Sequence, residues 1–175
     1  MQTQLYEHEI AETISMETSG RKLMWCGMFL FLLGLITGLF EERFTNMRMG
    51  LAAHLEGVMN GTFVVALGAI WSQVRLPRPA RATAYGMALY GTYGNWLTTM
   101  FAALFGTAAN TPIAAAGHTG QPWQERLVAA GFLSVAIAMV ASVVLVLWGL
   151  WGNVSQTDGG WEQMKSTISR GAERR

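Results

Sequence analysis

The chain has 175 residues, of which 51% are hydrophobic and 13% are charged, whereas an ordinary soluble domain carries about 25% charged residues. This deficit excludes a water-facing surface for most of the chain, and the formal net charge of +1 gives no electrostatic support to nucleic-acid binding. The single cysteine, Cys26, excludes an intrachain disulfide and argues against a thiolate metal site.

Four apolar runs dominate the sequence. Crossing a bilayer core of about 30 Å takes roughly 20 apolar residues in a helix, and each run approaches that length. They predict an all-α, integral membrane four-helix bundle that forms one domain. A soluble bundle of buried helices is the alternative, and too few amphipathic helices are present to cover it. The predicted helices cover residues 23–40, 49–71, 82–105 and 127–151, with polar tails at 1–22 and 152–175.

The distribution of basic residues predicts the orientation in the membrane, because cytoplasmic loops carry an excess of lysine and arginine. One side would hold Arg21, Lys22, Arg75, Arg78, Arg81, Lys165, Arg170, Arg174 and Arg175. The other side would hold only Arg43, Arg48 and Arg126. Both termini are therefore predicted to be cytoplasmic. Five tryptophans lie near the predicted interfaces, as in an aromatic belt: Trp25, Trp71, Trp123, Trp148 and Trp151.

Small residues at four-residue spacing predict close packing between the first two helices. Gly34 and Gly38 form a GxxxG pair on the first helix, and Ala53, Gly57 and Gly61 continue the same spacing on the second. In lipid, small residues at this spacing let two helix backbones approach closely.

Polar residues inside the second and third helices are candidate functional residues, because an unpaired polar group in hydrocarbon costs several kcal/mol. These candidates are His54, Glu56, Asn60, Tyr93, Asn95 and Thr99. Glu56 and Asn60 are four residues apart and share one helix face. His54 lies about 200° round the helix from Glu56, on the side of Gly57 and Gly61. This glycine-lined face of the second helix has room for a flat ligand, and the imidazole of His54 would bind a metal at its centre.

Each candidate also has a structural alternative that the sequence leaves open. A histidine near a helix end is commonly a hydrogen-bonded structural residue, and glycines commonly serve helix packing. In the structural alternatives, Glu56 pairs with Arg43 or Arg48, and Asn60 and Asn95 bond to each other across the helices. The tyrosine is alternatively a core aromatic residue. His118 lies in a predicted loop and is interpreted as a solvated residue rather than a metal ligand.

Three segments carry a family resemblance. The second helix reads His54-Leu-Glu-Gly-Val-Met-Asn60-Gly61, the third reads Tyr90-Gly-Thr-Tyr93-Gly-Asn95-Trp96, and the next loop reads Thr111-Pro-Ile-Ala-Ala-Ala-Gly-His118. With these motifs the chain resembles the hydroxylaminobenzene mutase family over about residues 23–151. Members are small bacterial membrane enzymes of aromatic degradation that convert hydroxylaminobenzene to 2-aminophenol. The resemblance implies a multi-pass isomerase of a bacterial inner membrane that acts on a small aromatic hydroxylamine in the lipid bilayer.

A more distant resemblance is to styrene oxide isomerase, which shares the His-x5-Asn-Gly pattern and an asparagine on the third helix. That enzyme binds ferric haem b through this histidine, in a trimer with haem between protomers. Carried over, His54 is the iron ligand beside the two glycines, and Asn60 and Asn95 lie in the pocket. The epoxide isomerase has a tyrosine where this chain has Thr99, so the resemblance leaves room for a different substrate.

The resemblance implies a ferric haem that acts as a Lewis acid, because no second axial histidine lies in the membrane. Asn60 and Asn95 would orient the substrate, Tyr93 is a candidate phenol donor, and Glu56 would accept the ring proton. Glu56 faces away from His54, so a neighbouring protomer is needed to bring the two together. Other functions stay open: an epoxide isomerase, a small transporter and a haem electron carrier.

Overall fold

The computed structural model describes residues 2–151, and for residues 2–16 it describes only the backbone helix. All regular structure in this part of the chain is helical, which confirms the predicted class. The long helices are α1 (Gln2–Leu39), α2 (Met47–Ile70), α3 (Arg78–Phe105) and α5 (Pro122–Trp151). The short ones are the 3-10 helices η1 (Glu41–Arg43) and η2 (Trp71–Gln73) and the single turn α4 (Pro112–Ala115).

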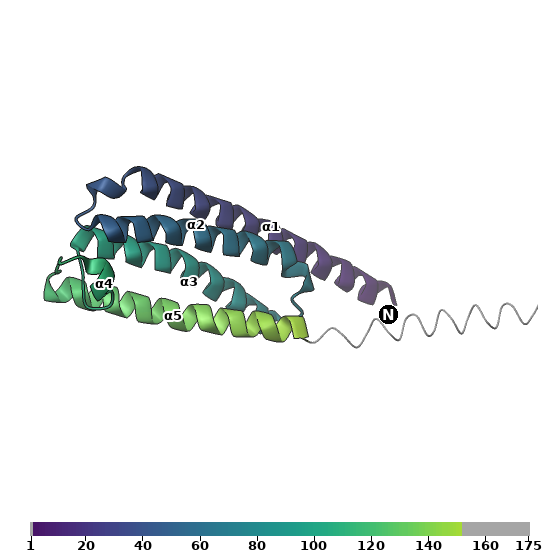
Figure 1. Cartoon of the computed structure of the whole chain (residues 1–175). Coiled ribbons are helices and arrows are strands. Elements are labelled where there is room, and N and C mark those ends of the chain that lie inside the picture. Colours follow the sequence, from purple (N-terminus) through teal and green to yellow (C-terminus); the bar gives the residue numbers. More distant parts are fainter. Residues whose placement is uncertain (1, 152–175) are drawn as a thin grey trace, which may run out of the picture.

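The long helices stand in a row in chain order, with α1 and α5 on the outer sides (Figure 1). α2 packs against α1 and α3, and α3 packs against α5. The start of α1 and the end of α5 lie at the same end of the row (Figure 1). The long helices therefore pack mainly against their neighbours in the chain. Short connections hold chain neighbours together, and the open apolar faces of the outer helices suit contact with lipid.

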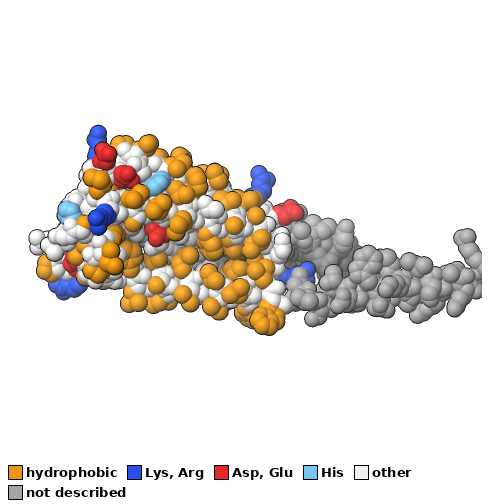
Figure 2. Space-filling view, in the orientation of Figure 1, with side chains coloured by type: hydrophobic (Ala, Val, Ile, Leu, Met, Phe, Trp, Pro, Cys, Tyr) orange, Lys and Arg blue, Asp and Glu red, His pale blue; other side chains and the backbone are white. Residues whose placement is uncertain are grey.

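Three stretches of helix are long and apolar enough to cross a membrane: Glu17–Leu39, Met47–Gln73 and Pro122–Trp151. α3 has sufficient length but is not among them, and it carries two arginines, several tyrosine and threonine side chains and Asn95. Hydrophobic side chains cover most of the face shown in Figure 2, and the basic side chains gather toward its two ends. The molecule therefore has the character of a membrane protein.

All four long helices begin earlier than the apolar runs predicted, α2 by two residues and the other three by four or more. α1 begins at Gln2, α3 at Arg78 and α5 at Pro122. Apolarity marks only the part of a helix that suits hydrocarbon, whereas the helix itself continues through polar residues of good helix propensity. Proline in the first turn of a helix loses no hydrogen bond, so Pro79 and Pro122 do not delay α3 and α5. The predicted polar tail 1–22 is thus helical from residue 2, and the tail 152–175 lies outside the described residues.

Asn46 joins the start of α2 to the loop that follows α3. Its Oδ1 accepts a hydrogen bond from the backbone N–H of Met49 (3.2 Å), which caps α2. Its Nδ2 donates to the carbonyl oxygens of Ala114 (2.8 Å) and Ala115 (3.1 Å). The side chain is 1% exposed. Asn46 therefore holds α4 against α2 at the end of the row opposite the start of α1.

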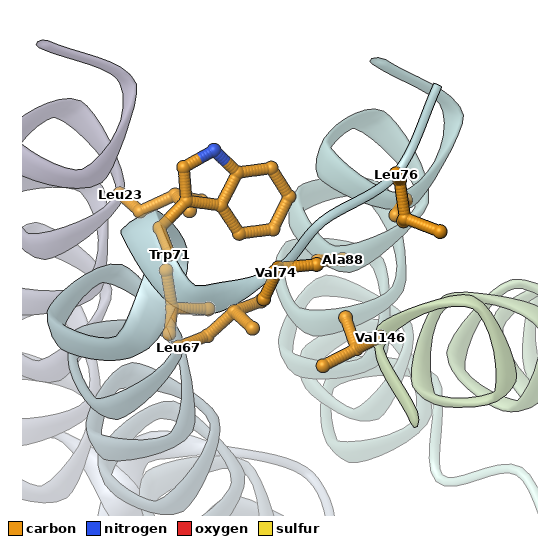
Figure 3. Packing of buried hydrophobic residues seen from close by; sticks show 9 residues of the cluster. Leu23, Leu67, Trp71, Val74, Leu76, Ala88 and Val146 are labelled. Carbon is orange, nitrogen blue, oxygen red and sulfur yellow. The ribbon is translucent and has the colours of Figure 1, made fainter. Parts of the chain in front are cut away.

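Trp71 anchors the apolar core at the end of the row where α1 begins. Its ring lies among Leu23 of α1, Leu67 of α2 and Val74 (Figure 3). It is 1% exposed, so within this chain the ring packs into the core. η2 turns the chain inward at this position and buries the ring. The other belt tryptophans, such as Trp151 at 86%, are largely exposed as predicted.

Candidate functional site

Facing glycines form the interface between α1 and α2. A Cβ added to Gly57 would collide with the Cα of Gly34, and one added to Gly61 would lie 2.7 Å from the carbonyl oxygen of Gly27. The two backbones therefore pack directly against each other, as the small-residue spacing predicted. α1 covers the surface of Gly57 and Gly61. This geometry fits their packing alternative and leaves no room for a haem wall at these glycines within one chain.

His54 lies on the α1 side of α2. Its Nδ1–H donates to the carbonyl oxygen of Gly34 at 2.8 Å, and Gly38 leaves space for the ring, because a Cβ there would lie 2.7 Å from Nδ1. A carbonyl oxygen only accepts, so Nδ1 carries the proton and Nε2 of the neutral ring keeps its lone pair. Within the described residues Nε2 has no hydrogen-bond partner and is not buried.

Glu56, Asn60 and Asn95 form a cluster between α2 and α3. Nδ2 of Asn60 donates to Oε2 of Glu56 at 3.1 Å, and Nδ2 of Asn95 donates to the same oxygen. The asparagines thus meet through the carboxylate rather than directly. In the described part of the chain Oε1 of Glu56 has no partner and is not buried. The cluster presents one accessible carboxylate oxygen and holds the other with two amides, instead of forming the alternative pair with Arg43 or Arg48.

Tyr93 and Trp96 reach from α3 across to α1. The Tyr93 hydroxyl donates to the carbonyl oxygen of Cys26 at 2.7 Å, and Nε1–H of Trp96 donates to the Thr37 hydroxyl at 3.1 Å. Trp96 also lies beside Gly57, where an added Cβ would be 3.0 Å from Cδ1. The contacts of Tyr93 therefore match the alternative in which it is a core aromatic residue. Sequence reasoning missed Thr37 and Trp96, because no spacing rule connects residues 59 positions apart.

In the part of the chain that the structure describes, the side chains of Thr99 and His118 form no hydrogen bond with His54 or with the Glu56 carboxylate. The Thr99 side chain is buried, and its hydroxyl donates to the carbonyl oxygen of Asn95 at 2.9 Å. His118 follows α4, and its backbone N–H donates to Ala115. Among the residues described, no group of three His, Cys, Asp or Glu side chains is placed to hold a metal ion. An axial haem ligand is a single side chain and needs no such group.

The implied haem can be tested against the chemistry of His54. An axial imidazole needs a free lone pair on one nitrogen and a hydrogen bond that orients the ring on the other. Nε2 meets the first requirement, and the Nδ1–H bond to Gly34 meets the second. The residues present therefore fit a metal bound through Nε2, on the side of α2 opposite the Glu56 cluster.

Comparison with known proteins gives matches across the helical region. A model of the styrene oxide isomerase family matches residues 19–151, a range that includes His54, Glu56 and both asparagines. Hydroxylaminobenzene mutase HabB of Ectopseudomonas oleovorans is 48% identical over 131 residues, which cover 74% of this chain and 80% of that protein. Hydroxylaminobenzene mutase HabA of the same organism is 41% identical over 125 residues, which cover 71% and 93% respectively. No solved structure matches the chain.

Proposed function

We propose for this chain, which belongs to the styrene oxide isomerase family, that it rearranges hydroxylaminobenzene to 2-aminophenol within the membrane. The mutase names of relatives at 48% and 41% identity support an isomerase, and they favour this substrate over an epoxide. The substrate is a small, largely apolar aromatic molecule that partitions into a bilayer. The reaction moves one oxygen from nitrogen to a ring carbon without net oxidation.

The observation that carries this proposal is the carboxylate of Glu56 inside an apolar helix. Glu56 lies about 14 Å from the start of α2, within the span Met47–Gln73. An ionisable residue at such a position is costly and marks a functional site. Asn60 and Asn95 hold only Oε2, so Oε1 is presented to an incoming molecule.

The proton balance of the rearrangement assigns a role to Glu56. The rearrangement removes one proton from the ortho carbon and adds one to the nitrogen, because a C–H becomes C–OH while NHOH becomes NH₂. One carboxylate serves both transfers: Oε1 of Glu56 accepts the ring proton and returns it to the nitrogen. Asn60 and Asn95 keep the carboxylate in one orientation throughout. The surrounding apolar helices exclude water, which would compete for the activated ring.

His54 is the residue that would hold haem b, through Nε2. Ferric haem bound there would supply a Lewis acid that weakens the N–O bond of the hydroxylamine. The hydrogen bond from Nδ1–H to Gly34 fixes the direction of Nε2. Gly38 is required at its position because a side chain would displace the imidazole.

The two halves of this site lie on opposite sides of α2. His54 contacts α1, whereas Glu56 contacts α3, so the body of α2 separates Nε2 from Oε1 within one chain. We therefore place the active site between two copies, with His54 of one copy facing the Glu56 cluster of the next. The assembly proposed is a homotrimer with haem at each protomer interface, as the resemblance implies.

Subunit mixing tests this arrangement. His54→Ala and Glu56→Gln chains with different affinity tags are coexpressed, and mixed oligomers are isolated by both tags. Shared sites restore about a third of wild-type turnover, because every mixed trimer joins an intact His54 to an intact Glu56 at one of its three interfaces. Oligomers of either variant alone stay inactive. No restoration, while wild type mixed with the double variant retains activity, would place both residues in one chain's site.

Thr99 separates the mutase from an epoxide isomerase. A threonine carries no phenol, and the Thr99 hydroxyl is buried and bonds to the backbone of its own helix. Thr99 therefore cannot take the part of the tyrosine at this position in the epoxide isomerase. The same purified protein is therefore assayed with hydroxylaminobenzene and with styrene oxide. We expect 2-aminophenol from the first and little phenylacetaldehyde from the second. The reverse preference would assign the chain to the epoxide reaction.

We propose that α3 is a fourth membrane span, with both termini in the cytoplasm of a bacterial inner membrane. α3 stands between α2 and α5 in the row, and Arg78 and Arg81 lie at the end where α1 begins (Figure 1). Single cysteines at Ser72 and at the exposed Asn110, which lie before and after α3, test this in a Cys26→Ser background. An impermeant thiol reagent should label Asn110→Cys in spheroplasts and Ser72→Cys only after lysis. Labelling of both positions before lysis would contradict the topology.

A further inference from the structure

A basic cavity lies at the end of the row where α1 begins, far along the chain from His54 and Glu56. Its volume is about 350 Å³. α1, η2 and α3 contribute to its walls. The lining residues are Ser19, Lys22, Trp71, Arg78, Arg81, Ala82 and Tyr85.

Three cationic side chains converge on this cavity, and none of its described lining residues is acidic. Lys22 and Arg78 are exposed, and Arg81 is half-buried. Both arginines make further interactions, but a guanidinium carries five N–H donors and can bind more than one group. Arg78 also begins α3, where the positive end of the helix dipole adds to the field. The cavity therefore favours an anion with several acceptor oxygens.

Aromatic rings form the inner wall. Trp71 and Tyr85 meet edge to face with ring centroids 5.8 Å apart. Figure 3 shows the indole nitrogen of Trp71 on the side of the ring turned away from Leu67 and Val74. An N–H donor and an apolar ring at one place are typical of residues at the boundary between lipid headgroups and acyl chains.

The geometry points to a binding site for the phosphate of an anionic membrane phospholipid. The cations would bind the phosphate oxygens, and the half-buried Tyr85 ring, supported by the buried Trp71, would lie against the glycerol and the upper acyl chain. A lipid is favoured over free phosphate because Lys22 lies within the candidate membrane span Glu17–Leu39, directly before the uncharged apolar run that begins at Leu23. The inference rests on the membrane character of the chain and not on its proposed chemistry.

Lipid titration tests the site in the detergent-purified full chain. Binding of dioleoyl phosphatidylglycerol, dioleoyl phosphatidylcholine and inorganic phosphate is followed by native mass spectrometry and by the thermal midpoint. Phosphatidylglycerol should bind saturably and raise the midpoint more than phosphatidylcholine. Because each cation near a membrane surface contributes about fivefold in affinity, Arg78→Gln/Arg81→Gln should weaken binding about 25-fold.

Two matched variants complete the test. Arg48→Gln/Arg126→Gln removes the same charge at the opposite end and should bind phosphatidylglycerol as the wild type does. Arg78→Lys/Arg81→Lys keeps the charge and should retain most of the affinity, which separates lost binding from lost folding. Equal loss in both glutamine variants, or equal binding of the two lipids, would overturn the site. Saturable inorganic phosphate binding without preference for phosphatidylglycerol would overturn the lipid assignment.

Discussion

The two interfaces that α2 makes are built in different ways. Toward α1, glycine backbones touch, and the side chain of His54 bonds to a backbone carbonyl. Toward α3, side chains fill the interface, and a carboxylate gathers amides from both helices. His54 and Glu56 are only two residues apart, so a helical turn of about 200° puts them in these separate surroundings.

This difference shows how one membrane helix can carry two chemistries. The rigid glycine interface fixes the direction of an imidazole and leaves Nε2 for a metal. The polar interface fixes a carboxylate and leaves one oxygen for a proton. Changes on the α1 side should therefore alter metal binding or stability, whereas changes on the α3 side should alter turnover with the metal retained.

The largest effect is expected at His54. Replacing it with alanine should lower turnover of hydroxylaminobenzene more than about 1,000-fold, because Lewis-acid stabilisation of several kcal/mol is lost. Formation of 2-aminophenol by purified protein is the measurement. Turnover within tenfold of wild type would show that the α1 side of α2 has no part in the chemistry.

A large but different effect is expected at Glu56. Glutamine keeps the size of the side chain and its contact with the asparagines but accepts no proton, so Glu56→Gln should slow kcat about 100- to 10,000-fold. Haem content should stay at the wild-type level, which distinguishes the two sides of α2. Glu42→Gln, at an exposed position, is the matched control. Loss of both haem and turnover in Glu56→Gln would show that the α1 side and the α3 side of α2 do not act independently.

Asn60→Ala tests how much the hydrogen bonds to Glu56 on the α3 side of α2 contribute to turnover. It removes one of the two amides that donate to the carboxylate. A hydrogen bond to a charged group contributes about 1.5–3 kcal/mol, so kcat should fall about 10- to 100-fold while haem is retained. Single-turnover kinetics with a ring-deuterated substrate should show a larger isotope effect than wild type if proton removal has become slower. An unchanged kcat would remove Asn60 from the site.

Gly57→Ala tests the α1 side through stability. The added methyl collides with Gly34 and should destabilise the fold by about 1–3 kcal/mol. Gly86→Ala is the control, because a Cβ there meets nothing within 4 Å, and this variant should keep or slightly raise the thermal midpoint. Equal midpoints for the two variants would mean that the helices do not pack through these glycines.

The smallest effect is expected at His118. It lies in the loop after α4, away from both interfaces of α2. His118→Ala should leave haem content and turnover within about twofold of wild type, as for most surface substitutions. A loss of bound metal in this variant would move the ligand from α2 to the loop.

Helical periodicity predicted part of the site. It placed Glu56 beside Asn60 and turned His54 toward the glycines, because both follow from about 100° per residue. It did not predict that Asn95 donates to Glu56, since that contact depends on how α3 is rotated against α2. The same limit left Trp96 and its bond to Thr37 unnoticed.

Hydropathy predicted the apolar spans better than the helices that contain them. It marked the part of α1 suited to lipid but not the polar residues with which the helix begins. It did not predict that η2 turns the Trp71 ring into the core. Composition reports which residues tolerate hydrocarbon, and the order in which helices pack is set by contacts that composition does not encode.

An absorption spectrum of detergent-purified wild-type and His54→Ala protein tests the assignment of His54 most directly. We predict a Soret band in the wild type that is absent from His54→Ala and present in Glu56→Gln. A colourless wild type that still forms 2-aminophenol, or a His54→Ala protein with an unaltered Soret band, would contradict haem ligation by His54.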